Sequence, residues 1–163
     1  MASPRNASRK IVSRGALLRR ARRFGTRRLV FTNGCFDLLH AGHVTLLERA
    51  KRYGDVLVVG INSDRSVRAL KGPGRPIVSQ RDRAAVLAAL ESVDYVTIFN
   101  ERTPQRLVEA LRPHVLIKGA DWAASEIVGR DVVRRRGGRI IRFPLLKGHS
   151  TSQLIRRIRH AGR

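Results

Sequence analysis

The stretch LVFTNGCFDLLHAGH, residues 29–43, decides the fold of this chain. It opens on Leu29–Thr32, a short apolar and β-branched run of the kind that forms a strand buried on both faces of a parallel sheet. Gly34 then permits a tight turn, and Gly42 lies where the amphipathic segment His43–Tyr53 begins. The succession of strand, turn and helix predicts one βα unit of an α/β fold.

The same alternation of short apolar runs and longer amphipathic segments continues to the end of the chain. Five runs predict strands at Leu29–Thr32, Val56–Ile61, Tyr95–Phe99, Val115–Lys118 and Arg139–Phe143. Further helices are predicted after Ser13, at Gln80–Leu90 with Ser79 as its cap, from Thr103-Pro104, before Gly137-Gly138, and after Ser150. We therefore expect a single Rossmann-like α/β domain over residues 29–163, with a five-stranded parallel sheet and helices on both faces, preceded by a basic arm and helix over residues 1–28.

The composition bounds the class of protein. With 163 residues, of which 42% are hydrophobic, the chain can bury one core. No apolar run approaches the roughly 20 residues that cross a bilayer. The single cysteine, Cys35, cannot form an internal disulfide. These features predict a soluble cytoplasmic protein without a membrane partner.

The formal net charge of +22 is concentrated at the two ends of the chain. Residues 1–28 and 134–163 each hold ten Lys or Arg and no acid, whereas residues 29–133 hold fourteen bases and twelve acids. A basic surface attracts nucleic acid, anionic lipid and nucleoside triphosphates alike. Proteins that bind single strands stack bases on exposed rings, and only Phe24 and Phe143 lie among the terminal charges. We favour solvated arginine faces and keep nucleic-acid binding as an alternative function.

His40 and His43 are the side chains most directly suited to phosphate. Their spacing of three at a predicted helix start allows both imidazoles to point to one side, beside the free N–H groups and positive dipole end of that helix. Together they can stabilise charge that moves onto a departing pyrophosphate. A metal site would need further ligands at a suitable spacing, and His114, His149 and His160 do not provide it. A Cys35–histidine catalytic pair is conceivable, although packing explains this cysteine better.

His40-Ala41-Gly42-His43 resembles the His-x-Gly-His signature of the cytidylyltransferase-like nucleotidyltransferases, and Asn33–Asp37 resembles the segment that precedes it there. The match extends over roughly residues 10–160 to one branch of that superfamily, the D-glycero-β-D-manno-heptose 1-phosphate adenylyltransferases. The further motifs are Asn62-Ser63-Asp64, Leu70-Lys71-Gly72, Arg75-Pro76-Ile77, Asp82-Arg83-Ala84, Val93–Val96, Thr103-Pro104, Leu111-Arg112-Pro113, Ile117–Trp122, Val128-Gly129 and Ser150-Thr151-Ser152.

The chain departs from the usual pattern of that branch at four positions. Lys147 replaces a common acid, His149 lies at a variable position, Ser152 replaces a second threonine, and Ala120 replaces a glycine. All four lie near the contacts that the resemblance implies for nucleotide and acceptor. The superfamily assignment is unaffected, but the exact acceptor stays open.

The resemblance also implies a set of site residues. His40, His43 and Lys71 would be catalytic, with Lys71 arriving on a mobile loop flanked by Gly72 and Gly74 to neutralise the triphosphate. The alternative for Lys71 is an ordinary surface lysine in a turn. The nucleotide and acceptor would be contacted by Thr32, Asn33, Gly34, Phe36, Asp37, Gly42, Lys118, Gly119, Asp121, Ser150, Thr151 and Ser152. Capping of the last helix would account for one of the three hydroxyl residues without any ligand. Arg83 and Asp94 are weaker candidates, because an arginine on a helix face and an aspartate at the turn into a strand are both ordinary.

The activity implied is transfer of AMP from ATP to a sugar 1-phosphate, with Mg²⁺ accompanying ATP and no metal bound by the protein alone. D-glycero-β-D-manno-heptose 1-phosphate is the expected acceptor, which would give ADP-heptose and pyrophosphate. One alternative uses CTP and a phosphoalcohol such as glycerol 3-phosphate. The family further implies a homodimer.

Overall fold

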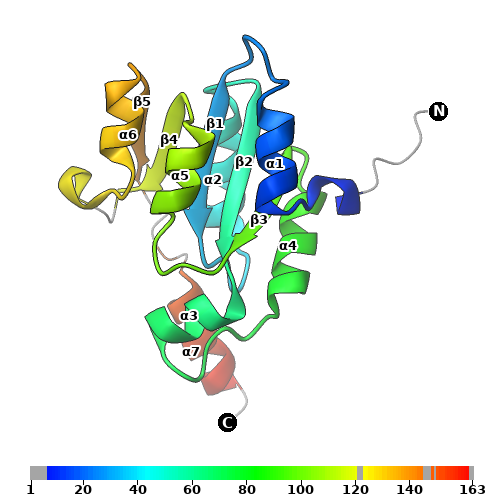
Figure 1. Cartoon of the computed structure of the whole chain (residues 1–163). Coiled ribbons are helices and arrows are strands. Elements are labelled where there is room, and N and C mark those ends of the chain that lie inside the picture. The colour runs from blue at the N-terminus through cyan, green and yellow to red at the C-terminus, as the bar shows by residue number, and fades with distance from the viewer. Residues whose placement is uncertain (1–6, 121–122, 145–147, 149, 162–163) are drawn as a thin grey trace.

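The computed structural model describes residues 7–120, 123–144, 148 and 150–161, and it shows a five-stranded sheet in which every pair of neighbouring strands is parallel (Figure 1). The strands lie in the order β3-β2-β1-β4-β5, so β1 is central. Their bounds are β1 Leu29–Gly34, β2 Val56–Asn62, β3 Tyr95–Phe99, β4 Val115–Gly119 and β5 Arg139–Phe143. The predicted Rossmann-like fold with a parallel sheet is confirmed, and all five predicted strands are present, three of them one or two residues longer than expected.

Helices occupy most of the connections between these strands. Each helix whose start was predicted from a cap is present: Ser13 Oγ accepts from Ala16 N at 3.3 Å, and Ser79 Oγ accepts from Asp82 N at 3.2 Å. The helices are α1 Arg14–Ala21, α2 Ala41–Lys51, α3 Asp64–Lys71, α4 Gln80–Ala89, α5 Gln105–Leu111, α6 Arg130–Arg135 and α7 Thr151–Ala161, with short 3-10 turns η1 Ala7–Lys10 and η2 Ala124–Glu126.

Helix α3 has no counterpart among the predicted elements. Ser63 caps it by accepting from Ser66 N at 3.2 Å, and Ser66 and Val67 are buried on its inner side. Lys71 is therefore the last residue of a helix and does not lie inside the following loop as expected. The helix is only eight residues long, too short for a repeating apolar pattern to be recognised in the sequence.

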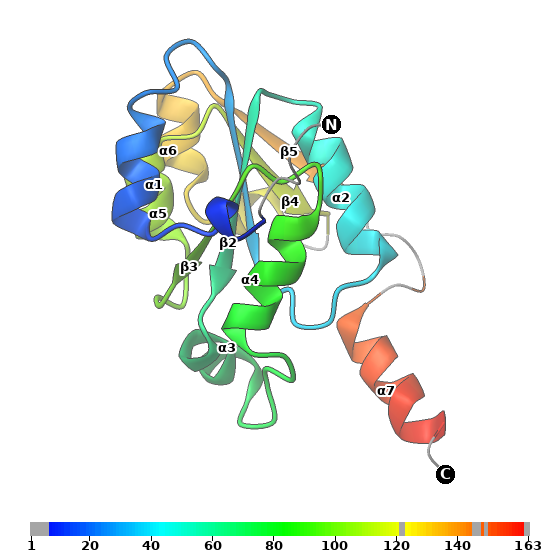
Figure 2. The ribbon, with the colours of Figure 1, turned by 90° about the vertical axis from the view of Figure 1, so that its right-hand side faces the viewer.

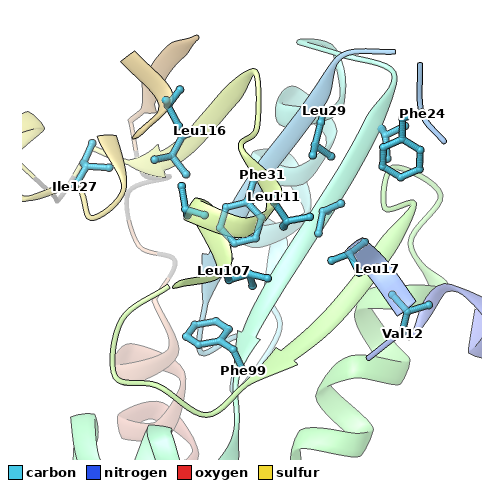
Figure 3. Packing of buried hydrophobic residues seen from close by; sticks show 14 residues of the cluster. Val12, Leu17, Phe24, Leu29, Phe31, Phe99, Leu107, Leu111, Leu116 and Ile127 are labelled. Carbon is cyan, nitrogen blue, oxygen red and sulfur yellow. The ribbon is translucent and has the colours of Figure 1, made fainter. Parts of the chain in front are cut away.

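The helices cover both faces of the sheet, as predicted (Figure 2). On one face, α1, α5 and α6 enclose a core to which the sheet contributes Phe31, Val58 and Leu116. Figure 3 shows Leu107 and Leu111 of α5 beside Phe31, and Leu17 of α1 farther along the same face, near Val12. On the other face, α2 and α4 supply Leu47, Ala50, Ala84, Leu87 and Ala88 against Val30, Leu57, Val59 and Ile117. Alternate residues of one strand thus enter different cores, which explains why the strands are almost continuously apolar.

Helices α3 and α7 do not cover a face of the sheet but lie beyond the carboxyl ends of the strands (Figures 1 and 2). Side chains at this edge can approach one another because all strands end there. Open α/β sheets bind ligands at such an edge, where the strand order reverses. Here the order reverses between β1 and β4, directly beside the turn 35–40. None of the helices in the described ranges has both the length and the apolar character of a membrane span.

The segment before residue 29 contributes to the core that α5 and the sheet share. Leu17 is fully buried there, together with Val12 and Phe24. Replacing Leu17 with Ala should lower the free energy of unfolding by about 2–5 kcal/mol, because the lost contacts leave a cavity. Urea unfolding would measure it. The matched control is Val86→Ala on α4, where the side chain is 48% exposed and the expected loss is below about 0.5 kcal/mol. Equal losses for the two variants would contradict burial of the N-terminal helix.

Candidate active site

The turn after β1 contains one residue with a positive φ and a glycine that leaves room for its ring. Phe36 has a φ of 47°, in the left-handed region that few side chains adopt, and it is nevertheless only 6% exposed. A Cβ atom on Gly34 would lie 3.1 Å from Cε2 of Phe36. Glycine at position 34 therefore lets the Phe36 ring lie back against the end of the strand. The ring in turn supports His43, whose centroid is 5.0 Å away.

The two histidines of the turn stack on each other. His40 is the N-cap residue of α2 and His43 is its third residue. Their ring centroids are 3.8 Å apart and the ring planes differ by 26°. The spacing of three therefore places both imidazoles on one side of the helix start.

The His43 ring is held in its neutral form. Burial, and to a smaller extent the neighbouring His40, lowers the pKa of His43 from 6.5 to about 4. Its Nδ1 atom is buried and has no hydrogen-bond partner among the described residues. A neutral imidazole has one donor and one acceptor nitrogen, so His43 can donate to a phosphate oxygen without carrying a permanent charge.

The start of α2 presents backbone donors to the same place. His43 N donates to the His40 backbone oxygen at 2.9 Å, whereas the N–H groups of Ala41 and Gly42 lack intrahelical acceptors and His40 provides no side-chain cap for them. No acidic side chain occupies the first turn of α2. The amides and the positive end of the helix dipole are therefore suited to an anion beside the histidines.

Lys71 brings a positive charge from the end of α3 toward the turn. Burial raises the pKa of the Cys35 thiol, and the charges of Lys71, Arg83 and Arg75 oppose this rise in pKa. Lys71 thus contributes to the electrostatic environment of Cys35, inside the turn that leads to His40. Its own side chain is exposed.

Cys35 itself has the environment of a packing residue. A raised pKa leaves its thiol protonated at neutral pH, and its Sγ lies 4.0 Å from Asn62 Oδ1. A nucleophilic cysteine needs a lowered pKa and an adjacent base. The structure favours the packing interpretation over a Cys35–histidine pair.

On the other side of β1, Lys118 approaches the same edge from β4. Its Nζ lies 3.5 Å from the backbone oxygen of Asn33, and Gly119 is the last residue of the strand. The side-chain oxygen of Asn33 is buried and has no partner within the described ranges. Thr32 is only 2% exposed inside β1, so its side chain is not presented to the open part of the site.

The hydroxyl residues before the last helix have separate roles. Ser150 Oγ caps α7 by accepting from Gln153 N at 3.2 Å, as predicted for one of the three. Thr151 Oγ1 donates to the Leu38 backbone oxygen at 3.3 Å, which ties α7 to the histidine turn, and Ser152 is exposed. The candidates Asp121 and Trp122 and the departures Lys147 and His149 lie outside the described residues.

Arg75, to which the sequence assigned no role, and Arg83, a weaker candidate, are both engaged at this edge. Arg75 forms an ion pair with Asp37, and Arg83 is 2% exposed and pairs with Asp64. The signal for Arg83 was available: it lies four residues before Leu87 on the inner stripe of α4, where an arginine must find partners. Asp94 accepts from Lys51 Nζ and from Leu57 N at the opposite edge of the sheet, away from the site.

Known proteins share the sequence and the fold of this chain. The family model for cytidylyltransferase-like proteins matches residues 31–157. The chain belongs to the cytidylyltransferase-like family. The match begins inside β1 and ends inside α7, so it spans the histidine turn, the Lys71 helix and the hydroxyl residues. The prediction of a nucleotidyltransferase of this superfamily is confirmed.

Curated relatives of this cytidylyltransferase-like chain carry the name bifunctional protein HldE. The protein of that name from Koribacter versatilis is 54% identical over 151 residues, which cover 91% of this chain and 31% of the relative. Its counterpart from Magnetococcus marinus is 56% identical over 131 residues, covering 80% of this chain and 27% of the relative. The chain thus spans less than a third of the length of these relatives.

Solved structures show the same fold. A lipopolysaccharide core biosynthesis protein from Thermoplasma volcanium has a TM-score of 0.63 and 27% identity, and the match covers 74% of this chain and 99% of that one. A pantoate-β-alanine ligase from Francisella tularensis has a TM-score of 0.60 at 16% identity, covering 87% of this chain and 68% of that one. The second likeness concerns the fold alone.

The buried neutral histidine makes stability depend on pH. An unfolded histidine has a pKa near 6.5, whereas the pKa of folded His43 is about 4, so between these values the unfolded chain binds a proton that the folded chain does not. The free energy of unfolding should therefore fall as the pH is lowered from 6.5 to 4, by at most roughly 3 kcal/mol from this residue. Urea unfolding between pH 7 and 4.5 should show a shallower decline for His43→Gln. His160→Gln, on an exposed turn of α7, is the control. Parallel declines for His43→Gln and the unmodified chain would contradict this view of the site.

Proposed function

We propose that this chain transfers AMP from ATP to the phosphate of a sugar 1-phosphate, with D-glycero-β-D-manno-heptose 1-phosphate as the acceptor. The observation that carries the proposal is the stacked pair His40 and His43 at the uncapped start of α2, with the charge of Lys71 close by. This arrangement offers two imidazoles, backbone amides and one cationic side chain to a single anion. The similarity to HldE proteins supports the heptose acceptor.

The reaction needs no nucleophile from the protein. An oxygen of the acceptor phosphate attacks the α-phosphorus of ATP and forms a new P–O bond, while the bond from the α-phosphorus to the bridging oxygen breaks and pyrophosphate leaves. A phosphomonoester with a second pKa near ~6 is already anionic at neutral pH, so a general base is unnecessary. The protein positions the two phosphates and stabilises the charge that moves onto pyrophosphate. His40, His43, the amides of α2 and Lys71 would share that task.

Magnesium enters this proposal as part of the ATP substrate. The described residues contain no group of three or more His, Cys, Asp or Glu arranged to hold a metal ion. The carboxylate of the histidine turn, Asp37, is occupied by Arg75 and two backbone amides. These residues do not form a protein cage for the ion.

A polar depression beside the start of α3 is our proposed place for the acceptor. Its volume is about 430 Å³. It is lined by Ser63, Asp64, Arg65, Arg68, Gln80 and Asn100. Carboxylate and carboxamide groups can hydrogen-bond to sugar hydroxyls, and the arginines favour an anionic ligand. Ser63 and Asn100 directly follow β2 and β3, so the depression lies at the same end of the sheet as the histidine turn.

The choice of nucleotide and acceptor is tested by a matrix of pyrophosphate release. ATP and CTP are each combined with heptose 1-phosphate, glucose 1-phosphate and glycerol 3-phosphate. We expect release with ATP and heptose 1-phosphate to exceed every other combination. Fastest release with CTP and glycerol 3-phosphate would replace our proposal by the alternative within the same family.

In keeping with the resemblance, we also propose a cytoplasmic homodimer, which sedimentation of the purified protein would test.

His43→Ala should reduce turnover by about 10²–10³-fold, because one donor to the developing charge is lost from a preorganised site. Pyrophosphate release at saturating ATP and acceptor measures it. Circular dichroism and urea unfolding at pH 7.5 verify that the variant is folded. His160→Ala, which removes an imidazole far along α7, is the matched control and should retain full turnover. Near-normal turnover in a folded His43→Ala protein would refute the assigned role.

A further inference from the structure

Asp37 is a buried carboxylate that belongs to the histidine turn but is directed at another loop. Its side chain is 0% exposed. One oxygen accepts from Ile77 N at 2.8 Å and from Val78 N at 2.9 Å, and the other is paired with Arg75 Nε. All three donors belong to the loop 72–79, which begins directly after Lys71. Both oxygens of Asp37 are therefore occupied by the loop that follows Lys71.

Arg83 is the buried charge of opposite sign at the same place. Its side chain is also 0% exposed and makes three kinds of contact. It donates to the backbone oxygen of Val78 at 3.0 Å, to that of Cys35 at 2.5 Å, and to Asp64 Oδ1 at 2.8 Å. One guanidinium thus joins the histidine turn, the end of the loop 72–79 and the start of α3.

These contacts enclose the segment that carries Lys71. Asp64 is the first residue of α3 and Lys71 the last, and the chain returns through the loop to Val78. Arg83 holds both ends of the segment 64–78, and Asp37 holds the loop 72–79 within it. The ends are anchored to Cys35 and Asp37, which lie in the turn that leads to His40.

We propose that Asp37 and Arg83 are positioning residues, which set the place of Lys71 relative to the histidine pair without touching the nucleotide. The inference rests on the proposed function and deepens it. Lys71 has a flexible four-carbon stem and an exposed side chain, so the rigidity of its backbone decides where its charge can act. A displacement of about 1 Å in a catalytic group can reduce the rate by about 10²-fold. Buried ion pairs seldom add much stability. Here they join the histidine turn, the loop 72–79 and the start of α3 in one geometry.

A double-mutant cycle between Asp37→Asn and Lys71→Ala tests the proposal. Asparagine keeps the shape of the side chain and removes its charge. We expect Asp37→Asn to lower kcat by about 10–100-fold and to change the KM for ATP by less than about 3-fold. The variant with both substitutions should be no slower than Lys71→Ala alone, because Asp37 acts through Lys71. If the kcat losses of the two single variants multiply in the double variant, Asp37 acts on the nucleotide directly, and the proposal is overturned.

Controls separate positioning from loss of folding. Asp131→Asn removes a carboxylate whose side chain is 68% exposed on α6 and should leave kcat unchanged. On α4, Arg83→Met is compared with Arg81→Met, since Arg81 is exposed two residues earlier. If Arg83→Met does not fold, Arg83→Lys, which keeps the charge and loses the fork of donors, is used instead, with a smaller loss of kcat expected. Unchanged kcat in a folded Asp37→Asn protein would overturn the proposal.

Hydrogen exchange tests the clamp without any enzymatic activity. The Ile77 and Val78 amides bonded to Asp37 should be protected in the unmodified chain and should exchange at least about 10-fold faster in Asp37→Asn. Exchange in the strand β2 should not change. If the unmodified chain transfers no nucleotide to any acceptor, the proposed function fails while the exchange result stands. Unaltered exchange of these amides would overturn the clamp whatever the activity.

Discussion

The meeting of parallel strands at one edge is the constraint on which the rest of this structure depends. Because β1 is central and the strand order reverses beside it, the turn 35–40 lies within reach of the segments that follow β2, β4 and β5. Lys118 approaches Asn33 from one side, Arg83 reaches Cys35 from the other, and Thr151 bonds to Leu38 from below. A parallel sheet thus brings together groups that are far apart in the chain.

The polar groups at this edge fall into two sets, one with hydrogen-bond partners and one without. The supporting set, Asp37 and Arg83, is fully buried and hydrogen-bonded to backbone and charged partners. The other set includes His43 Nδ1 and Asn33 Oδ1, which are buried without partners among the described residues, and the first amides of α2. Unsatisfied buried groups are costly, so their concentration in one turn marks the place where a ligand would supply the missing bonds. The satisfied groups hold the unsatisfied ones in place.

The sequence predicted the sheet, most helices and the histidine turn because these follow local rules. Apolar runs mark strands, and Ser13 and Ser79 mark helix starts by their own hydrogen bonds. The sequence did not predict α3, whose burial is confined to one turn. It also did not predict the partners of the two buried charges. Asp37 bonds to residues 38–41 positions away along the chain, and Arg83 bonds to Asp64 and Cys35, 19 and 48 positions away. Such pairings depend on how the loops return to the sheet edge, and no local pattern encodes that.

Charge acts on two length scales in this protein. The exposed arginines of α1 and α7, among them Arg19, Arg156 and Arg157, belong to the net charge of +22 and attract any anion over distances comparable to the screening length of about 8–10 Å. They cannot select among anions. Selection requires short-range groups with fixed geometry, and the His43 ring has that property because burial keeps it neutral and Phe36 holds it in place. A neutral donor adds directionality where the surrounding basic surface adds only attraction, so the general charge and the specific site make separate contributions to binding.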